Sequence, residues 1–334
     1  MQREPLPEGS VILMSNGAKY TIKRCIGRGG FSLVYSAETD GVSSSPAIKE
    51  FFPAEGAFRD NGEVRPLHGS EERFNDHLKQ FQNEQVISGK LAETSSQIIS
   101  AVASNERYVA MFAHSRDMHS LGGLVEAWGQ GLVLGEENVD PVFPDLIRLW
   151  CALHIIESTL IALKAVHNKG YLHLDITDTN VMWAGEEVKN GRACLLDFGC
   201  AAKMNEDKVY TSEQYLSYSP GFAAPEMHNK KGSFTRSTDI YSVGMLLFYL
   251  CVGKRALEIT RNRECKIERE ISRLSIPEKF CEKLKEIIVK ATDSTPDKRY
   301  PDAESMCEAI RALKMKFPNA RLTGIIRRVF PCTL

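Results

Sequence analysis

Three side chains that carry oxygen stand close together between residues 171 and 199, in the segments HLDITDTN and LLDFG. Asp175 and Asn180 lie five residues apart, and Asp197 follows on the far side of a segment that reads as a hairpin. Hard divalent cations take oxygen ligands, and Mg²⁺ commonly binds one or two carboxylates together with phosphate oxygens. The pattern therefore predicts a site for a divalent cation and a phosphate group.

The order and spacing of these residues resemble those of the protein kinase family. The matching positions are His173-Leu174-Asp175, Asn180 and Asp197-Phe198-Gly199. The resemblance implies phosphoryl transfer from ATP, with Mg²⁺ as the metal. Asp175 would accept or orient the proton of the substrate hydroxyl, and Asn180 and Asp197 would hold Mg²⁺.

A glycine-rich turn, GRGGFSLV, interrupts residues 17–50, which otherwise alternate between apolar and polar side chains as strands do. Glycine lets backbone N–H groups approach a phosphate closely, although an ordinary hairpin turn has the same appearance. The turn resembles the glycine-rich loop of kinases, with Ser32 in place of the third glycine. The resemblance implies that the following residues bind ATP: Gly27, Gly29, Gly30, Ser32, Val34, Ala47, Lys49, Met111, Phe112 and Ala113.

Lys49 lies within an apolar strand, where an ammonium group needs a carboxylate partner or a phosphate. Glu84 lies in a segment whose apolar residues recur at helical spacing, and the residues alone favour a surface glutamate over a partner for Lys49. The resemblance makes Glu84 the helix C glutamate that positions Lys49 against the α- and β-phosphates. Four residues later, Ser88 stands where kinases usually carry a large apolar side chain.

Two strands are predicted over residues 97–104 and 107–113, joined by Asn105-Glu106. The resemblance places Met111 at the back of the adenine pocket. It places Phe112, Ala113 and His114 in the hinge, whose backbone groups hydrogen-bond adenine.

The second half of the chain is predicted to be mainly helical, with helices over 145–166 and 303–313. Between them lies a polar segment, 200–226, whose length suits an activation segment. Asp239 reads as a helix N-terminal residue whose carboxylate caps nearby N–H groups. The resemblance adds that Asp239 holds the catalytic loop and that Arg299 pairs with Glu226.

Ser219-Pro220 stands where Ser/Thr kinases carry Thr-Pro, which favours a protein substrate with a Ser or Thr hydroxyl and allows autophosphorylation. Two positions depart from the family pattern. Leu174 replaces the arginine that usually docks an activation-segment phosphate, so ordering without phosphorylation is predicted. Thr177 replaces a lysine that faces the γ-phosphate, which keeps open a pseudokinase that binds nucleotide without turnover. A small-molecule phosphotransferase is a third hypothesis.

The resemblance covers about residues 18–314 and implies an α+β, bilobal protein-kinase-like fold. An N-terminal lobe, 17–114, would contain an antiparallel sheet, one helix C and a loop insertion at 53–72. A larger, mostly helical C-terminal lobe, 115–314, would contain an insertion at 115–144. Residues 1–16 form an N-terminal extension and 315–334 a tail. The combination of GRGGFSLVY and AIKEFFP resembles a bacterial, eukaryotic-like Ser/Thr kinase subgroup.

Composition and charge limit which other classes of protein the chain could belong to. The chain has 334 residues, 43% of them hydrophobic, with 42 basic against 43 acidic residues, so no global field points to nucleic acid. The basic residues between 254 and 273 alternate with glutamates and read as a solvated helical face. Nine cysteines without a C-x-x-C pair indicate neither a disulfide framework nor a zinc site. We expect a cytoplasmic protein without a transmembrane segment, and a secreted effector stays open.

Overall fold

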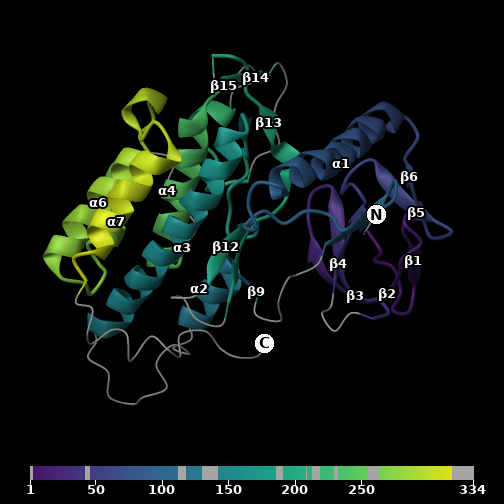
Figure 1. Cartoon of the computed structure of the whole chain (residues 1–334), viewed down its shortest axis with the longest axis horizontal. Coiled ribbons are helices and arrows are strands. Elements are labelled where there is room, and N and C mark those ends of the chain that lie inside the picture. Colours follow the sequence, from purple (N-terminus) through teal and green to yellow (C-terminus); the bar gives the residue numbers. More distant parts are fainter. Residues whose placement is uncertain are drawn as a thin grey trace. The chain divides into compact units, whose positions relative to one another are not determined.

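The computed structural model describes residues 3–41, 46–111, 118–129, 142–185, 191–207, 209–212, 219–228, 232–254 and 263–317. The chain divides into two compact units, residues 1–116 and 117–334 (Figure 1). The first unit combines a sheet with a long helix, and the described part of the second is mainly helical. The predicted α+β class, with an N-terminal antiparallel sheet and a helical C-terminal region, is confirmed.

A six-stranded antiparallel sheet forms the centre of the first unit, in the order β1-β2-β3-β4-β8-β7. Its strands are β1 (Val11–Leu13), β2 (Lys19–Arg28), β3 (Ser32–Glu38), β4 (Ala47–Phe51), β8 (Tyr108–Met111) and β7 (Ala103–Ser104). The N–H of Ser15 donates to the Ser104 carbonyl at 3.0 Å, and the Asn105 amide donates to the Leu13 carbonyl at 2.9 Å. These bonds bring the two edge strands together, so the sheet curls on itself.

The strand predicted over 97–104 is much shorter in the structure. Only its last two residues, Ala103 and Ser104 of β7, pair with β8. Ile98 and Ile99 are buried but belong to no strand, and they follow a turn that begins at Ser95. Their apolar character reflects burial, which periodicity does not distinguish from strand pairing. The strand predicted over 107–113 is observed as β8, and residues 112 and 113 lie outside the described part of the chain.

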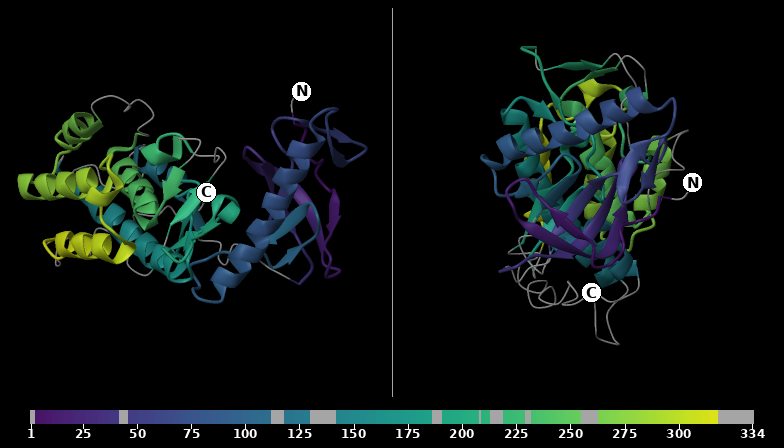
Figure 2. Two further views of the ribbon diagram at one scale, coloured as in Figure 1. Left: turned by 90° about the horizontal axis from the view of Figure 1, so that it is seen from above. Right: turned by 90° about the vertical axis from the view of Figure 1, so that its right-hand side faces the viewer.

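Helix α1 (Glu71–Ala92) runs alongside the sheet of the first unit (Figure 2). The ring of Phe51 on β4 lies 5.1 Å from that of Phe74 and 5.6 Å from that of Phe81, both on α1. Val86, by contrast, is exposed. The predicted insertion at 53–72 contains a hairpin, β5 (Ala57–Asp60) with β6 (Glu63–Pro66). Its turn is Asn61-Gly62, both with positive φ, which is the pair that two-residue hairpin turns favour.

The second unit contains α2 (Leu121–Gly129), α3 (Val142–Asn168), α4 (Arg236–Val252), α5 (Arg263–Ile271), α6 (Glu278–Ala291) and α7 (Ala303–Lys314). Helix α3 packs against α4 and α7, and α6 and α7 lie side by side (Figures 1 and 2). Gly244 brings α4 close to α6, because a Cβ there would lie 2.7 Å from the Cβ of Ala291. Among the described helices, α3 alone is long and apolar enough to cross a membrane, and 61% of its apolar window is buried within the chain.

Short strands hold the loops of the second unit. A three-stranded sheet has the order β12 (Arg192–Leu195), β11 (Val181–Ala184) and β9 (Met118–Ser120). Two further pairs are β10 (Tyr171–Leu172) with β13 (Ala202–Lys203), and β14 (Tyr210–Ser212) with β15 (Gly232–Phe234). Residues 118–129, within the predicted insertion at 115–144, form β9 and α2. The eight cysteines in the described ranges are all free thiols.

Candidate active site

Lys49 lies in the middle of β4, opposite Val34 of β3 and Val109 of β8. Its Nζ lies 2.7 Å from Oε2 and 2.9 Å from Oε1 of Glu84, on α1. Both side chains are nearly buried, at 8% and 12% exposure, so the carboxylate compensates an ammonium that would otherwise be costly. The structure thus places the two residues in the pairing that the resemblance implied.

The glycine-rich loop joins β2 to β3 as a narrow hairpin, with Gly27 opposite Val34. The N–H of Gly29 donates to the Ser32 carbonyl at 2.9 Å, and no atom would contact a Cβ at Gly30 within 4 Å. The turn therefore leaves open space beside Gly30. Ala47 lies opposite Met111 on the neighbouring strand, whereas the predicted hinge residues 112–114 lie outside the described ranges.

In the second unit, the carboxylate of Asp175 is held on both oxygens. Ser219 Oγ donates to Oδ1 at 2.7 Å, and Asn180 Nδ2 donates to Oδ2 at 2.7 Å and to the Asp175 carbonyl at 3.0 Å. Thr177 stabilises the turn between them, because its Oγ1 accepts from the N–H groups of Thr179 at 3.3 Å and Asn180 at 3.2 Å. The Ser219 contact is one that the sequence prediction missed, since it used Ser219 only as a sign of substrate class.

Asp239, on α4, holds the chain just before Asp175. Its buried carboxylate accepts from the N–H groups of His173 at 2.9 Å and Leu174 at 2.8 Å, and lies 2.8 Å from His167 Nε2. Burial alone would raise the pKa of Asp239, but the hydrogen bond and charge of His167, with further contributions from His173, lower it overall.

The prediction that Asp239 caps its own helix is wrong. Thr235 caps α4, through a capping box with Thr238. The carboxylate of Asp239 is directed to loop N–H groups instead, as the family resemblance implied.

Asp197 follows β12 with a left-handed backbone, at φ 57° and ψ 78°, and accepts from the N–H of Gly199 at 3.3 Å. The next ring, Phe198, is buried against His173 with centroids 4.7 Å apart. The N–H of Leu196 donates to the Asn180 carbonyl at 2.9 Å. These contacts fix the loop of Asp197 beside the loop of Asp175 and Asn180.

The carboxylates of Asp175 and Asp197 together make the site favourable for a cation. Burial raises the pKa of Asp175, and the negative charge of Asp197 adds to it, against opposing hydrogen bonds from Ser219 and Asn180. Because the amide nitrogen of Asn180 is bound to Asp175, its oxygen is the atom that it can offer to a metal. No cluster of three or more His, Cys, Asp or Glu occurs in the described residues, but Mg²⁺ requires only one or two carboxylates beside phosphate and water. Asn180 and Asp197 therefore fit a magnesium ion bound with a phosphate.

The segment after Asp197 is held to the second unit by backbone pairing. Strand β13 pairs with β10, and β14 pairs with β15, where the rings of Tyr210 and Phe234 stack at 6.2 Å. At its end, the buried Arg299 forks onto Glu226 with Nη1–Oε1 at 2.7 Å and Nη2–Oε2 at 2.8 Å. This is the ion pair that the resemblance implied.

A family model described as protein kinase domain matches residues 20–312. The chain belongs to the protein kinase family. This kinase chain is 25% identical over 301 residues to serine/threonine-protein kinase D of Synechocystis, covering 88% of the chain and 52% of that relative. It is 23% identical over 308 residues to serine/threonine-protein kinase PknA of Nostoc, covering 90% and 48%. The kinase chain thus spans about half the length of these curated relatives.

Solved structures agree on the fold. The apo form of PpkA-294 superposes with a TM-score of 0.58 at 21% identity, covering 92% of this chain and 99% of that one. The kinase domain of Mycobacterium tuberculosis PknI gives a TM-score of 0.59 at 18% identity, covering 92% and 100%. The predicted resemblance to protein kinases is confirmed.

Proposed function

We propose that this chain is an active protein kinase that transfers the γ-phosphoryl group of ATP to Ser or Thr hydroxyls of proteins. The observation that carries the proposal is Asp175, whose carboxylate is held by Asn180 and Ser219 beside that of Asp197. Magnesium ATP, when bound, supplies the phosphoryl group and neutralises charge that develops in transfer. The relatives named serine/threonine-protein kinases support the acceptor class.

Each proposed site residue has one task. Asp175 orients the substrate hydroxyl and takes its proton, and a raised pKa suits a carboxylate that works as a base. Lys49, held by Glu84, binds the α- and β-phosphates, and Asn180 and Asp197 hold the metal. The glycine-rich loop contributes backbone N–H groups to the phosphates.

We further propose that the activation segment orders without phosphorylation. Leu174 is 2% exposed, so a buried apolar side chain stands where most kinases have a phosphate-binding arginine. The pairing of β13 with β10 and of β14 with β15 supports an order that depends on backbone hydrogen bonds. Phosphatase treatment should therefore leave activity unchanged, and its abolition would contradict this part of the proposal.

A pseudokinase is the second candidate, and Thr177 is the observation that favours it. Its hydroxyl is used within the turn to Asn180, so it does not replace the missing cation at the γ-phosphate. The ion pair of Glu226 with Arg299 supports a protein kinase over a small-molecule phosphotransferase, since it stabilises the Ala-Pro-Glu segment implied in peptide docking.

Transfer of radiolabel from ATP to the chain itself and to a generic basic protein separates these candidates. We expect Asp175→Ala to lower transfer about 10²- to 10⁴-fold, the usual contribution of a general base, while retaining nucleotide binding. Glu308→Ala, which changes an exposed carboxylate on α7, is the matched control. Wild-type transfer no greater than that of Asp175→Ala, with nucleotide bound, would establish the pseudokinase instead.

A further inference from the structure

Glu50 is the residue next to Lys49 on β4, and the two side chains leave opposite faces of the strand. Lys49 meets Glu84 of α1. Glu50 is fully buried on the other face, where it has no part in the proposed chemistry. A buried carboxylate is costly unless donors surround it, so its surroundings indicate what it holds in place.

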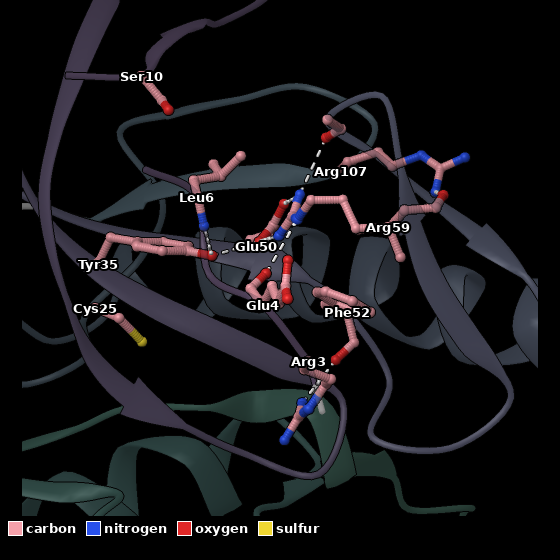
Figure 3. Close-up of polar contacts among 12 residues, drawn as sticks. Arg3, Glu4, Leu6, Ser10, Cys25, Tyr35, Glu50, Phe52, Arg59 and Arg107 are labelled. Atoms are coloured by element: carbon pink, nitrogen blue, oxygen red, sulfur yellow. Dashed lines mark hydrogen bonds and ion pairs between the residues drawn. The ribbon is translucent and has the colours of Figure 1, made fainter. Parts of the chain in front are cut away.

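Four donors converge on the Glu50 carboxylate, and Figure 3 shows those of Tyr35 and Arg59. Tyr35 Oη donates to Oε2 at 2.7 Å and Tyr108 Oη donates to Oε1 at 2.8 Å. Arg59, from the β5–β6 hairpin, forks onto both oxygens at 2.9 Å and 2.7 Å. Burial raises the pKa of both tyrosines and Glu50 raises it further, so they stay protonated as donors. Glu50 thus ties β3, β4, β8 and the hairpin to one point.

The same network holds the N-terminal segment, residues 3–6, onto the unit. The Leu6 N–H donates to Tyr35 Oη at 3.1 Å, and Arg59 Nε donates to the Glu4 carbonyl at 3.1 Å. Two of the three side chains that bind Glu50, those of Tyr35 and Arg59, therefore also bind this segment, as Figure 3 shows. We call residues 3–6 the N-terminal strap.

Arg3, at the end of the strap, reaches the glycine-rich loop. Its Nη1 donates to the Phe52 carbonyl at 2.7 Å and to the Ser32 carbonyl at 3.5 Å, and Arg28 Nη1 donates to the Arg3 carbonyl at 2.9 Å. Phe52 itself binds the loop, since its N–H donates to the Phe31 carbonyl at 3.0 Å. Arg3 therefore links Ser32, the first residue of β3 after the glycine-rich turn, to Phe52, the residue that follows the strand carrying Lys49.

We propose that the N-terminal strap positions the glycine-rich loop for nucleotide, with Arg3 and Glu50 as its positioning residues. The inference rests on the proposed function, because the loop is taken to bind the phosphates of ATP. Loss of the Arg3 side chain removes its hydrogen bonds to the Phe52 and Ser32 carbonyls, so the loop samples more conformations and ATP must order it on binding. Nucleotide affinity should fall while the Lys49–Glu84 pair stays intact.

The test compares Arg3→Ala, Arg3→Lys and the control Arg24→Ala in the full chain. Arg24 is an exposed arginine on the same strand as Arg28. Two quantities are measured: the hydrogen exchange of the amides of residues 28–33, Phe52 and Ala54, and the Kd of a fluorescent ATP analogue. We expect Arg3→Ala to speed exchange and raise the Kd about fivefold each, as loss of one net hydrogen bond gives. Arg3→Lys should recover part of both, and Arg24→Ala should match wild type.

The outcomes separate the inference from the proposed function. If wild type binds the analogue and Arg3→Ala changes neither exchange nor Kd, the strap has no positioning role. A lower melting temperature with unchanged Kd would also overturn it, because that is the result of a purely structural contact. If wild type binds no analogue, the proposed function fails with the nucleotide part of the inference, and the exchange comparison still decides whether the strap holds the loop.

Discussion

Asp239→Asn is the substitution whose cost follows most directly from the geometry. The carboxylate is fully buried, and it accepts from two backbone N–H groups and lies at hydrogen-bond distance from His167. Oδ1 accepts from Leu174, whereas Oδ2 accepts from His173 and contacts His167. An asparagine has nearly the same shape, so packing changes little and the effect isolates the polar contacts.

The amide nitrogen of the variant must replace one of these two oxygens. If it replaces Oδ1, it faces the N–H of Leu174, and both donors lose their acceptor in a buried site. Each buried unsatisfied group costs about 1–3 kcal/mol, and part of this is offset because no charge is buried. We expect a loss of about 2–4 kcal/mol in the free energy of unfolding of the second unit.

The chain offers a specific probe for that unit, because its three tryptophans, at 128, 150 and 183, all lie within residues 117–334. Urea denaturation followed by tryptophan fluorescence therefore reports on the second unit alone. Asp297→Asn, at an exposed position, is the matched control.

Because the pKa of Asp239 is lowered on folding from its ordinary 3.8, its contribution is complete above that value and is lost as the pH falls through the lower pKa of the folded state. The difference between wild type and variant should thus shrink below that pH. A loss below about 0.5 kcal/mol at neutral pH, the usual range for a surface change, would refute the reasoning.

Three further predictions concern other parts of the chain. Glu84→Gln should lower kcat/KM about 10²-fold through misplacement of Lys49, measured by transfer kinetics, while an unchanged value would remove the pair from the mechanism. The pKa of Asp175 in the chain without ligands is raised above its ordinary 3.8, and its base form is required, so the acid limb of the pH profile of kcat/KM should lie above that value; a limb at or below 3.8 would contradict it. Gly244→Ala should destabilise the second unit by about 1–3 kcal/mol in the tryptophan assay, since α6 must shift, and a neutral effect would show that the contact is readily relieved.

The types and order of the proposed site residues could be predicted because motifs keep them at short spacings. Asp175 and Asn180 share one turn, and Lys49 shows itself as a cation inside an apolar strand. The Asn61-Gly62 pair is a local signal for a hairpin turn, although only the structure shows the paired strands β5 and β6 on either side of it. Helix α1 followed from its apolar spacing, which the rings of Phe74 and Phe81 on Phe51 bear out.

The sequence by itself determined which chemistry the chain can carry, since side-chain type and local spacing set the groups available for metal, phosphate and proton. Only the tertiary structure decided which distant residues hold those groups. Ser219 reaches Asp175 from 44 residues away, and Asp239 binds Leu174 from 65 residues away. Glu50 reads as an ordinary charge next to Lys49, yet it is fully buried beneath Arg59 and two tyrosines. Such contacts leave no local pattern, because a buried polar group is satisfied by whichever donor the fold brings to it.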